Sequence, residues 1–230
     1  MAPRHFTIVM PVLNEGANIA ATLQPLQTAR SKTTEVMVVD GGSTDETVDR
    51  AKALCDLVIS AETGRAAQMN AGARCASGQV LVFLHADTQF TDTHLAALAL
   101  RLADGRGSWG RFDVRLSGRS QWFRMIETMI NWRSRWTGVA TGDQAIFVRR
   151  ETFESVGGFP EIELMEDIVL SKRLRRLNWP VCVAEPPVVT SSRRWESNGI
   201  LRTVVLMWGL RAAFFFGVSP ARLRAFYRNH

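Results

Sequence analysis

Residues 35–46 read Glu-Val-Met-Val-Val-Asp-Gly-Gly-Ser-Thr-Asp-Glu, and this stretch decides the fold. A short apolar run that closes on two glycines is typical of a buried strand followed by a tight turn. Ser43, with Glu46 three residues later, has the pattern of a capping box, so we expect a helix to begin at Ser43. The stretch is therefore predicted to be a strand and a helix in direct succession, which is the repeating unit of α/β proteins.

The same alternation continues on both sides of this unit. Further patterns follow in the order strand 6–12, helix 18–28, strand 56–60, helix 64–75, strand 79–85 and helix 92–102. These strands are apolar with little polar alternation, which is typical of strands buried on both faces. The first half of the chain is therefore predicted to be an α/β, Rossmann-like domain whose mainly parallel sheet has helices on both faces.

The second half has a different pattern. Residues 109–116 alternate, with Arg111, Asp113 and Arg115 on one face and apolar side chains on the other, so we expect a half-exposed strand. Residues 121–136 have apolar side chains at helical spacing, which predicts an amphipathic helix. The remaining predicted elements of a single domain over residues 1–193 are a strand at 144–148, a helix at 161–177 and a strand at 180–184.

Residues 194–230 are predicted to form a helical extension. The last 60 residues of the chain hold 11 basic and 2 acidic residues, whereas the net charge of the whole chain is +6. The apolar run 200–218 is interrupted by two arginines and has Gly209 at its middle, so we expect two short helices that meet near Gly209. Three placements stay open, namely docking on the core, a homodimer interface, or contact with a membrane surface where the arginines reach the headgroups.

Length and composition exclude several classes of protein. A chain of 230 residues with 46% hydrophobic and 22% charged residues is ordinary for a globular domain, which argues against a disordered chain and a multi-span membrane protein. The three cysteines have no disulfide or zinc spacing and suit a reducing compartment. The first apolar run is too short for a signal peptide, so we expect a cytoplasmic protein. Arginine content alone does not predict a nucleic-acid site.

Polar residues follow the strands at what should be one edge of the sheet, where ligands of open α/β sheets bind. An acceptor at Asp40 would suit a base, and Gly41 would let the backbone approach that base closely. Asn14 and Glu15 would hold a nucleoside. Arg65, at a helix start, would suit a diphosphate. Each of these residues also has an alternative role as a turn residue, a helix cap or an exposed polar group.

Two further pairs carry candidate chemistry. His85 and Asp87 lie two residues apart at a strand end, so their side chains share one face. Asp87 is a hard oxygen ligand for Mg²⁺ or Mn²⁺, and imidazole tolerates Mn²⁺ better. Glu166 and Asp167, near a helix start, would place one carboxylate in a cleft as a general base. The alternatives are turn polarity for the first pair and compensation of the helix dipole for the second.

Six motifs in this order resemble the inverting family 2 glycosyltransferases of the GT-A fold. They are Pro-Val-Leu-Asn-Glu at 11–15, Val-Val-Asp-Gly-Gly-Ser-Thr-Asp at 38–45, Gly-Arg at 64–65 with Gln-Met-Asn-Ala-Gly at 68–72, Leu-His-Ala-Asp-Thr at 84–88, Gly-Gly-Phe-Pro at 157–160 and Met-Glu-Asp at 165–167. The resemblance covers about residues 6–178 and looks closest to short bacterial members encoded near radical-SAM and selenium- or arsenic-related proteins. It implies sugar transfer from a nucleotide sugar, with a UDP-sugar favoured, to a small-molecule or lipid-linked acceptor.

The resemblance also implies a role for each matching residue. Asp167 would be the catalytic base, and Asp87 the metal-binding acid with His85 beside it. The acceptor side would be shaped by Gly158, Phe159 and Glu166. The donor nucleotide, its diphosphate or its sugar would contact Pro11, Asn14, Glu15, Asp40, Gly41, Arg65, Asn70, Asp143 and Arg194.

The sequence departs from the family pattern at one position. The first acid of the Asp-x-Asp metal motif is His85 here, which removes one negative charge and leaves the choice between Mn²⁺ and Mg²⁺ open. Ser-Arg-Arg-Trp at 192–195 is similar to an element that processive members use near donor phosphates, but without a transmembrane channel we do not expect processivity. Two other functions stay open, a nucleotidyltransferase and a non-catalytic nucleotide-binding protein at a membrane surface.

Overall fold

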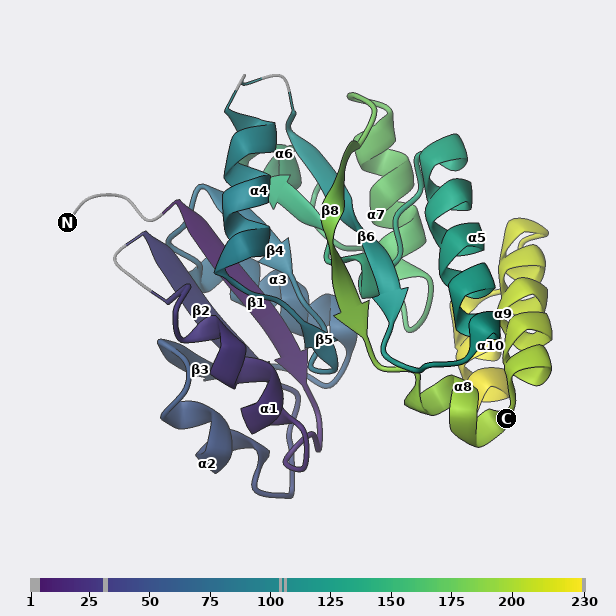
Figure 1. Ribbon diagram of the computed structural model, residues 1–230, viewed down its shortest axis with the longest axis horizontal. Helices are drawn as coiled ribbons and strands as arrows, with labels where there is room; N and C mark the ends of the chain where they lie inside the picture. Colours follow the sequence, from purple (N-terminus) through teal and green to yellow (C-terminus); the bar gives the residue numbers. More distant parts are fainter. Residues whose placement is uncertain (1–4, 31–32, 104, 106, 229–230) are drawn as a thin grey trace.

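A computed structural model of the chain describes residues 5–30, 33–103, 105 and 107–228, with the side chains of Arg194 and Arg228 outside that description. Within these residues, eight strands form one sheet in the order β3-β2-β1-β4-β7-β6-β8-β5 (Figure 1). The strands are β1 (Phe6–Val12), β2 (Thr34–Asp40), β3 (Leu57–Ser60), β4 (Val80–Phe83), β5 (Thr88–Gln89), β6 (Trp109–Leu116), β7 (Phe147–Arg149) and β8 (Val181–Thr190). Only β7 and β5 run against the others, so the predicted mainly parallel sheet is confirmed.

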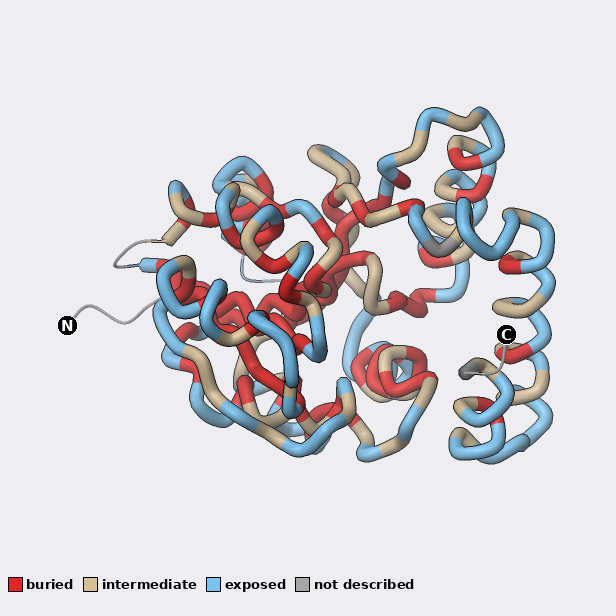
Figure 2. Tube along the Cα trace, turned by 90° about the horizontal axis from the view of Figure 1, so that it is seen from below, coloured by how far each residue is buried: buried red, intermediate tan, exposed pale blue. Residues whose placement is uncertain are grey.

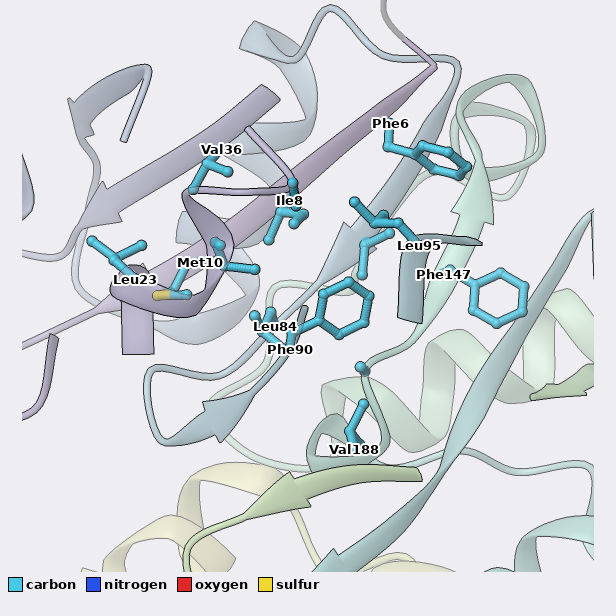
Figure 3. Packing of buried hydrophobic residues seen from close by; sticks show 14 of the residues in the cluster. Phe6, Ile8, Met10, Leu23, Val36, Leu84, Phe90, Leu95, Phe147 and Val188 are labelled. Atoms are coloured by element: carbon cyan, nitrogen blue, oxygen red, sulfur yellow. The ribbon is translucent and has the colours of Figure 1, made fainter. Parts of the chain in front are cut away.

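Helices cover both faces of the sheet, as predicted. Along β1, successive side chains point to opposite faces, so Ile8 and Met10 join one hydrophobic cluster and Val9 joins the other. The first cluster, which Figure 3 shows packed around Phe90, is closed by α1 (Ile19–Leu23) with its short 3-10 turn η1 (Gln24–Leu26), α2 (Thr47–Lys52) and α4 (Asp92–Leu102). The second cluster is closed by α3 (Arg65–Cys75), α6 (Arg150–Ser155) and α7 (Glu166–Arg175).

The strand β6 is more buried than its sequence pattern predicts. Arg111 and Asp113 are only 1% and 6% exposed. Nη1 of Arg111 donates to Oδ1 of Asp113 at 2.5 Å, and Asp113 also pairs with Arg135 of α5 (Gln121–Thr137). The expected exposure was wrong for Arg111 and Asp113, because α5 covers them and brings a complementary charge, whereas Arg115 is exposed as predicted.

Two helices begin later than the sequence predicts. The α2 helix begins at Thr47 and not at Ser43, because the Ser43 hydroxyl accepts a hydrogen bond from the Asn14 N–H and does not cap the helix. The α7 helix begins at Glu166, directly after Met165, whose backbone is left-handed with a φ of 71°. Both shifts lie in loops that belong to the candidate site.

The C-terminal segment forms α8 (Arg193–Asn198), α9 (Ile200–Phe215) and α10 (Pro220–Arg228). The expected break at Gly209 was wrong, because α9 runs unbroken through it: an interior glycine costs a helix about 1 kcal/mol but need not end it. The chain turns at Gly217, where φ is 87°. One face of α9 packs on Met165 and Ile168. Across the described ranges, none of the helices has both the length and the apolar character that crossing a bilayer requires.

Candidate active site

The loops that follow β1 and β2 are joined to each other at one edge of the sheet. Asn14 lies in left-handed backbone with a φ of 54°, which asparagine tolerates. Its N–H donates to Oγ of Ser43 at 2.9 Å, and its Oδ1 accepts from the N–H of Thr44 at 2.9 Å. Glu15 is half-buried beside it, and its Oε2 accepts from Nδ2 of Asn18 at 3.1 Å. The structure therefore brings the two loops predicted to hold a nucleoside together.

Asp40 ends β2 with its carboxylate turned into its own loop. The carboxylate is buried and accepts hydrogen bonds from the N–H groups of Gly42 and Ser43 at 3.1 Å. This is the turn-stabilising role that the sequence left open. A carboxylate has about four acceptor positions, so the predicted contact with a base stays compatible with this arrangement. Pro11, in the neighbouring strand β1, is buried.

Gln68 of α3 holds the ends of β1 and β2 in place, a role that no pattern in the sequence indicates. Its side chain is buried, and Nε2 donates to the carbonyl oxygens of Val12 and Val39 at 2.8 Å each. A Cβ at Gly41 would lie 2.9 Å from this amide, so the close approach requires glycine there. From the sequence, Gln68 is only a polar residue on a helix. The helical pattern does not show that the carbonyl groups of Val12 and Val39 lie next to its side chain.

Asn70 is paired with the backbone of Phe159, and its predicted contact with the donor stays a prediction. Its Nδ2 donates to the Phe159 carbonyl oxygen and its Oδ1 accepts from the Phe159 N–H, both at 2.9 Å. A Cβ at Gly158, where φ is 66°, would lie 2.7 Å from Oδ1 of Asn70. Both polar groups of the Asn70 amide are thus used to fix the Gly158–Phe159 turn, the segment predicted on the acceptor side.

A small pocket connects the strand-end edge to the start of α7. The ring of His85 lies against Gly142 in the short turn η2 (Gly142–Gln144), since a Cβ at residue 142 would come within 2.5 Å of Nε2 of His85. His85, which follows β4, and Glu166 and Asp167, which begin α7, were predicted separately along the sequence. The structure places them around the same pocket. The pocket is lined by Met69, Phe83, His85, Gly142, Ile146, Phe159, Glu166 and Asp167.

Asp167 is oriented by two backbone donors. Its Oδ2 accepts from the Gly142 N–H at 2.8 Å, and its Oδ1 accepts from the Ile168 N–H at 2.7 Å. Burial raises the pKa of Asp167 above its ordinary value, although these two hydrogen bonds oppose the rise. A fixed carboxylate with a raised pKa in a pocket can accept a proton near neutral pH.

Glu166 precedes this carboxylate and is also buried. Burial raises the pKa of Glu166 to about 7, the neighbouring Asp167 carboxylate adds to the rise, and Arg65 opposes it. Arg65 is the exposed first residue of α3, as the sequence predicts. From the start of α3, the positive charge of Arg65 therefore favours the ionised form of Glu166 in this pocket.

Arg133 of α5 is a second residue that the sequence analysis missed. Its Nε and Nη2 atoms are buried and have no hydrogen-bond partner in the described part of the chain, and the same is true of Oδ1 of Asp143. Burial, followed by the charge of Arg211 in α9, lowers the pKa of Arg133 to about 10, while Asp143 and Asp167 oppose this change. On the sequence Arg133 is one charge on an amphipathic helix, which is usually solvated. Arg194 lies in α8, but its side chain is outside the described structure, so its predicted donor contact stays a prediction.

Asp87 and His85 are the residues predicted to hold a divalent metal ion. Asp87 is half-buried in the turn after β4, and its carbonyl oxygen accepts from the Ser191 N–H at 3.2 Å. Among the residues that the structure describes, no three His, Cys, Asp or Glu side chains converge as metal ligands. The protein thus offers one carboxylate and one imidazole, and Mg²⁺ in nucleotide sites commonly takes one or two carboxylates plus substrate phosphates.

We expect Glu166→Gln to raise the free energy of unfolding at about pH 8 by about 1–3 kcal/mol and to leave it nearly unchanged at about pH 5. Burial raises the pKa of this carboxyl from 4.5 to about 7, so the folded protein holds the proton more tightly than the unfolded chain. Stability is therefore lost as the pH rises through that interval, when the buried group ionises. Glutamine carries no charge and avoids this loss. Urea unfolding at the two pH values measures the difference.

Glu163→Gln is the matched control, because Glu163 is exposed in the loop before α7 and the substitution removes the same charge. We expect no pH-dependent gain from it. An equal effect of Glu166→Gln at both pH values would show that the Glu166 carboxylate is not destabilised by burial.

The chain matches one family of known proteins. The model of the family described as Glycosyl transferase family 2 matches residues 7–157. Two glycosyltransferases named for PGL/p-HBAD biosynthesis, from Mycobacterium bovis and Mycobacterium tuberculosis, are 31% identical to the chain over 176 residues. These matches cover 69% of this chain and 64% of each relative, so the chain spans less than two thirds of the length of the relatives.

Solved structures share the fold. TarS of Staphylococcus aureus in complex with UDP-GlcNAc matches with a TM-score of 0.66 and 21% identity, over 81% of this chain and 58% of that chain. The mannosyltransferase PcManGT of Pyrobaculum calidifontis, in complex with GDP-Man and Mn²⁺, matches with a TM-score of 0.65 and 24% identity. The match covers 96% of this chain and 68% of that chain. Glucosyl-3-phosphoglycerate synthase of Mycobacterium tuberculosis, in complex with Mn²⁺, UDP and glucosyl-3-phosphoglycerate, matches with a TM-score of 0.61 and 21% identity. The match covers 82% of this chain and 70% of that chain. The chain therefore has the Rossmann-like GT-A fold of these glycosyltransferases.

Proposed function

The chain belongs to glycosyl transferase family 2, and on that premise we propose that it transfers a sugar from a nucleotide-sugar donor to an acceptor, with inversion at the anomeric carbon. The observation that carries the proposal is the Asp167 carboxylate. It is oriented by two backbone donors, has a raised pKa, and opens into a pocket at the strand-end edge of the sheet. A positioned base beside a nucleotide-binding edge is what a direct displacement requires.

Asp167 acts as the base in this reaction. An acceptor hydroxyl gives its proton to the Asp167 carboxylate while its oxygen forms the new bond to the anomeric carbon. The bond from that carbon to the donor diphosphate breaks, and its electron pair leaves with the diphosphate oxygen. The hydrogen bonds from Gly142 and Ile168 aim the carboxylate, and the Gly158–Phe159 turn, held by Asn70, shapes the side from which the acceptor enters.

The donor occupies the loops after β1 and β2, with its nucleoside near Asn14, Glu15 and Asp40 and its diphosphate toward Arg65. Asp87, with His85 beside it, would hold a divalent metal ion, Mn²⁺ or Mg²⁺. Such an ion supplies positive charge to the diphosphate as it leaves. A UDP-sugar is the favoured donor, supported by structural neighbours named as complexes with UDP-GlcNAc or UDP, although another is named with GDP-Man.

The acceptor is a small molecule or a lipid-linked molecule. The relatives named for PGL/p-HBAD biosynthesis are glycosyltransferases, and their name leaves the class of the acceptor of this chain open. A lipid-linked acceptor would go together with a peripheral position at the inner face of the membrane, through residues 194–230. A homodimer through the same residues is the other arrangement that the sequence left open.

Thermal unfolding with UDP, GDP or CDP, each with and without Mn²⁺, tests the donor site. At a nucleotide concentration near 100 times Kd, binding adds about 2.7 kcal/mol, which for a chain of this size raises Tm by about 5–10 °C. We expect this shift with UDP in the presence of Mn²⁺. A shift with GDP alone would keep the mechanism and change the donor, whereas no shift with any nucleotide would contradict the proposed donor site.

Release of the nucleoside diphosphate separates the proposal from its enzymatic alternative. A glycosyltransferase releases UDP from a UDP-sugar by transfer or slow hydrolysis. A nucleotidyltransferase would instead form a nucleotide sugar from a nucleoside triphosphate and release pyrophosphate.

A further inference from the structure

The outward face of α9 is apolar along its whole length. A helix at the surface of a globular protein normally presents polar side chains to water. In α9, all of whose residues are described, the only charged residue among the exposed ones is Arg202. Figure 2 shows this exposure along the helices near the C-terminus, and Trp208 and Phe215 are 62% and 76% exposed. The large apolar side chains of this face are Leu201, Val205, Trp208, Phe215 and Phe216.

The α5 helix carries a second exposed apolar stripe next to the first. Ile126 of α5 packs in one cluster with Ile200 and Val204 of α9. The two helices are therefore neighbours, and their exposed stripes lie beside each other. Residues three or four apart lie on the same side of a helix, and the exposed members of this stripe follow that spacing. They are Trp122, Met125, Met129, Trp132 and Trp136, and together with the α9 residues above they form what we call the α5–α9 surface.

The segment that carries α9 and α10 brings charge of one sign to the α5–α9 surface. From Gly199 to the end of the chain the sequence holds five arginines and no aspartate or glutamate. Arg202 and Arg222 are exposed. Tryptophan rings favour the boundary between headgroups and acyl chains, and arginine side chains reach from an apolar face to the headgroups. An apolar face with a basic rim is complementary to a bilayer that contains anionic lipids.

A second copy of this chain is a poorer partner for the same surface. In a twofold dimer the same patch of both subunits meets, so the C-terminal arginines of one copy would face those of the other. No carboxylate of residues 199–230 is available to neutralise them. Charge complementarity therefore favours an anionic bilayer.

We propose that the α5–α9 surface binds the surface of an anionic lipid bilayer, with α9 lying flat among the headgroups. With 16 residues, α9 is too short to span a bilayer and suits the interfacial position. The inner face of α9 packs on Met165 and Ile168, which flank Glu166 and Asp167. A bound bilayer would thus lie one helix diameter, about 10 Å, from the N-terminus of α7, which carries the base. The proposal concerns binding alone and does not depend on the sugar-transfer reaction.

Sedimentation of the full chain with vesicles tests the proposal. Vesicles of phosphatidylcholine with about 30% phosphatidylglycerol are compared with vesicles of phosphatidylcholine alone, each at about 0.1 M and 0.5 M salt. We expect strong binding to the anionic vesicles, weaker binding at high salt, and little binding to phosphatidylcholine alone. Trp208→Ala and Phe215→Ala should each weaken binding about tenfold, because each removes a side chain that the bilayer would bury.

Leu100→Ala and Arg101→Gln are the matched controls, since both residues are exposed on α4, away from the α5–α9 surface. They should bind as the unchanged chain does, whereas Arg202→Gln should weaken binding to anionic vesicles about fivefold. Equal binding by the Trp208 and Leu100 variants, or no binding of the unchanged chain to anionic vesicles, would overturn the proposal. So would a concentration-dependent dimer in light scattering that is lost in the Trp208 variant, because a second copy would then cover this surface.

Discussion

Asp167→Asn is expected to lower turnover by about 10²–10⁴-fold, the usual contribution of a general base, while nucleotide binding stays unchanged. Asparagine has the same shape and its Oδ1 can still accept one of the two hydrogen bonds that Gly142 and Ile168 donate at 2.8 Å and 2.7 Å. Its amide cannot take a proton from an acceptor hydroxyl. The initial rate of UDP release from a UDP-sugar measures the loss, and thermal unfolding with UDP and Mn²⁺ measures the binding.

The pH dependence of the same rate gives an independent check on this base. Because burial raises the pKa of Asp167, the rate of the unchanged enzyme should fall as the pH is lowered through that raised value. The residual rate of Asp167→Asn should lack this dependence. Glu161→Gln, which removes the same charge from an exposed position before α7, is the control and should keep the full rate and the full pH profile. A full rate in Asp167→Asn would refute the assignment of the base.

Asp87→Ala is expected to abolish the Mn²⁺-dependent part of the nucleotide-induced stabilisation, which amounts to about 5–10 °C in Tm at saturation. Asp87 is the carboxylate of a two-residue donor set, so its loss leaves the His85 imidazole as the sole protein ligand. One neutral imidazole holds a hard divalent cation poorly. Thermal unfolding with UDP, titrated with Mn²⁺ and separately with Mg²⁺, measures the effect without any need for an acceptor.

Asp92→Ala is the control for this experiment. Asp92 is exposed at the start of α4, five residues from Asp87, and the substitution removes the same charge. It should keep the Mn²⁺ dependence. If Asp87→Ala also keeps it, Asp87 does not hold the metal ion, and the base assignment at Asp167 would stand unaffected.

Much of the N-terminal half of the chain could be predicted from single segments. The strands around β1 and β2 are continuous apolar runs, and a strand buried on both faces needs that composition wherever it occurs. The glycines at 41 and 42 and the polar residues at Asn14 and Asp40 lie directly at strand ends. Their convergence on one edge follows from the parallel direction of the strands.

Some predictions failed where a distant element changes the surroundings of a residue. The alternation in β6 indicated two faces correctly, but no local signal shows that α5 covers the polar face with Arg135. The helix expected to break at Gly209 continues, because the residues around glycine favour the helix by more than that one residue disfavours it. Arg133 looks solvated in its own segment, but two of its guanidinium nitrogens are buried, and charged residues of η2 and α9 act on it.

The sequence by itself determined the order of most strands and helices, without the short β5 and α6, the fold class, and the set of polar residues at the strand ends, because each depends on residues a few positions apart. The tertiary structure alone decided what those residues contact. It turned Asn70 to the backbone of Phe159, 89 residues away, and Gln68 to the carbonyl of Val12, 56 residues away. It also raised the pKa of Asp167 by burying it. Burial and hydrogen-bond partners are properties of the assembled layers, so no single segment of the sequence contains them.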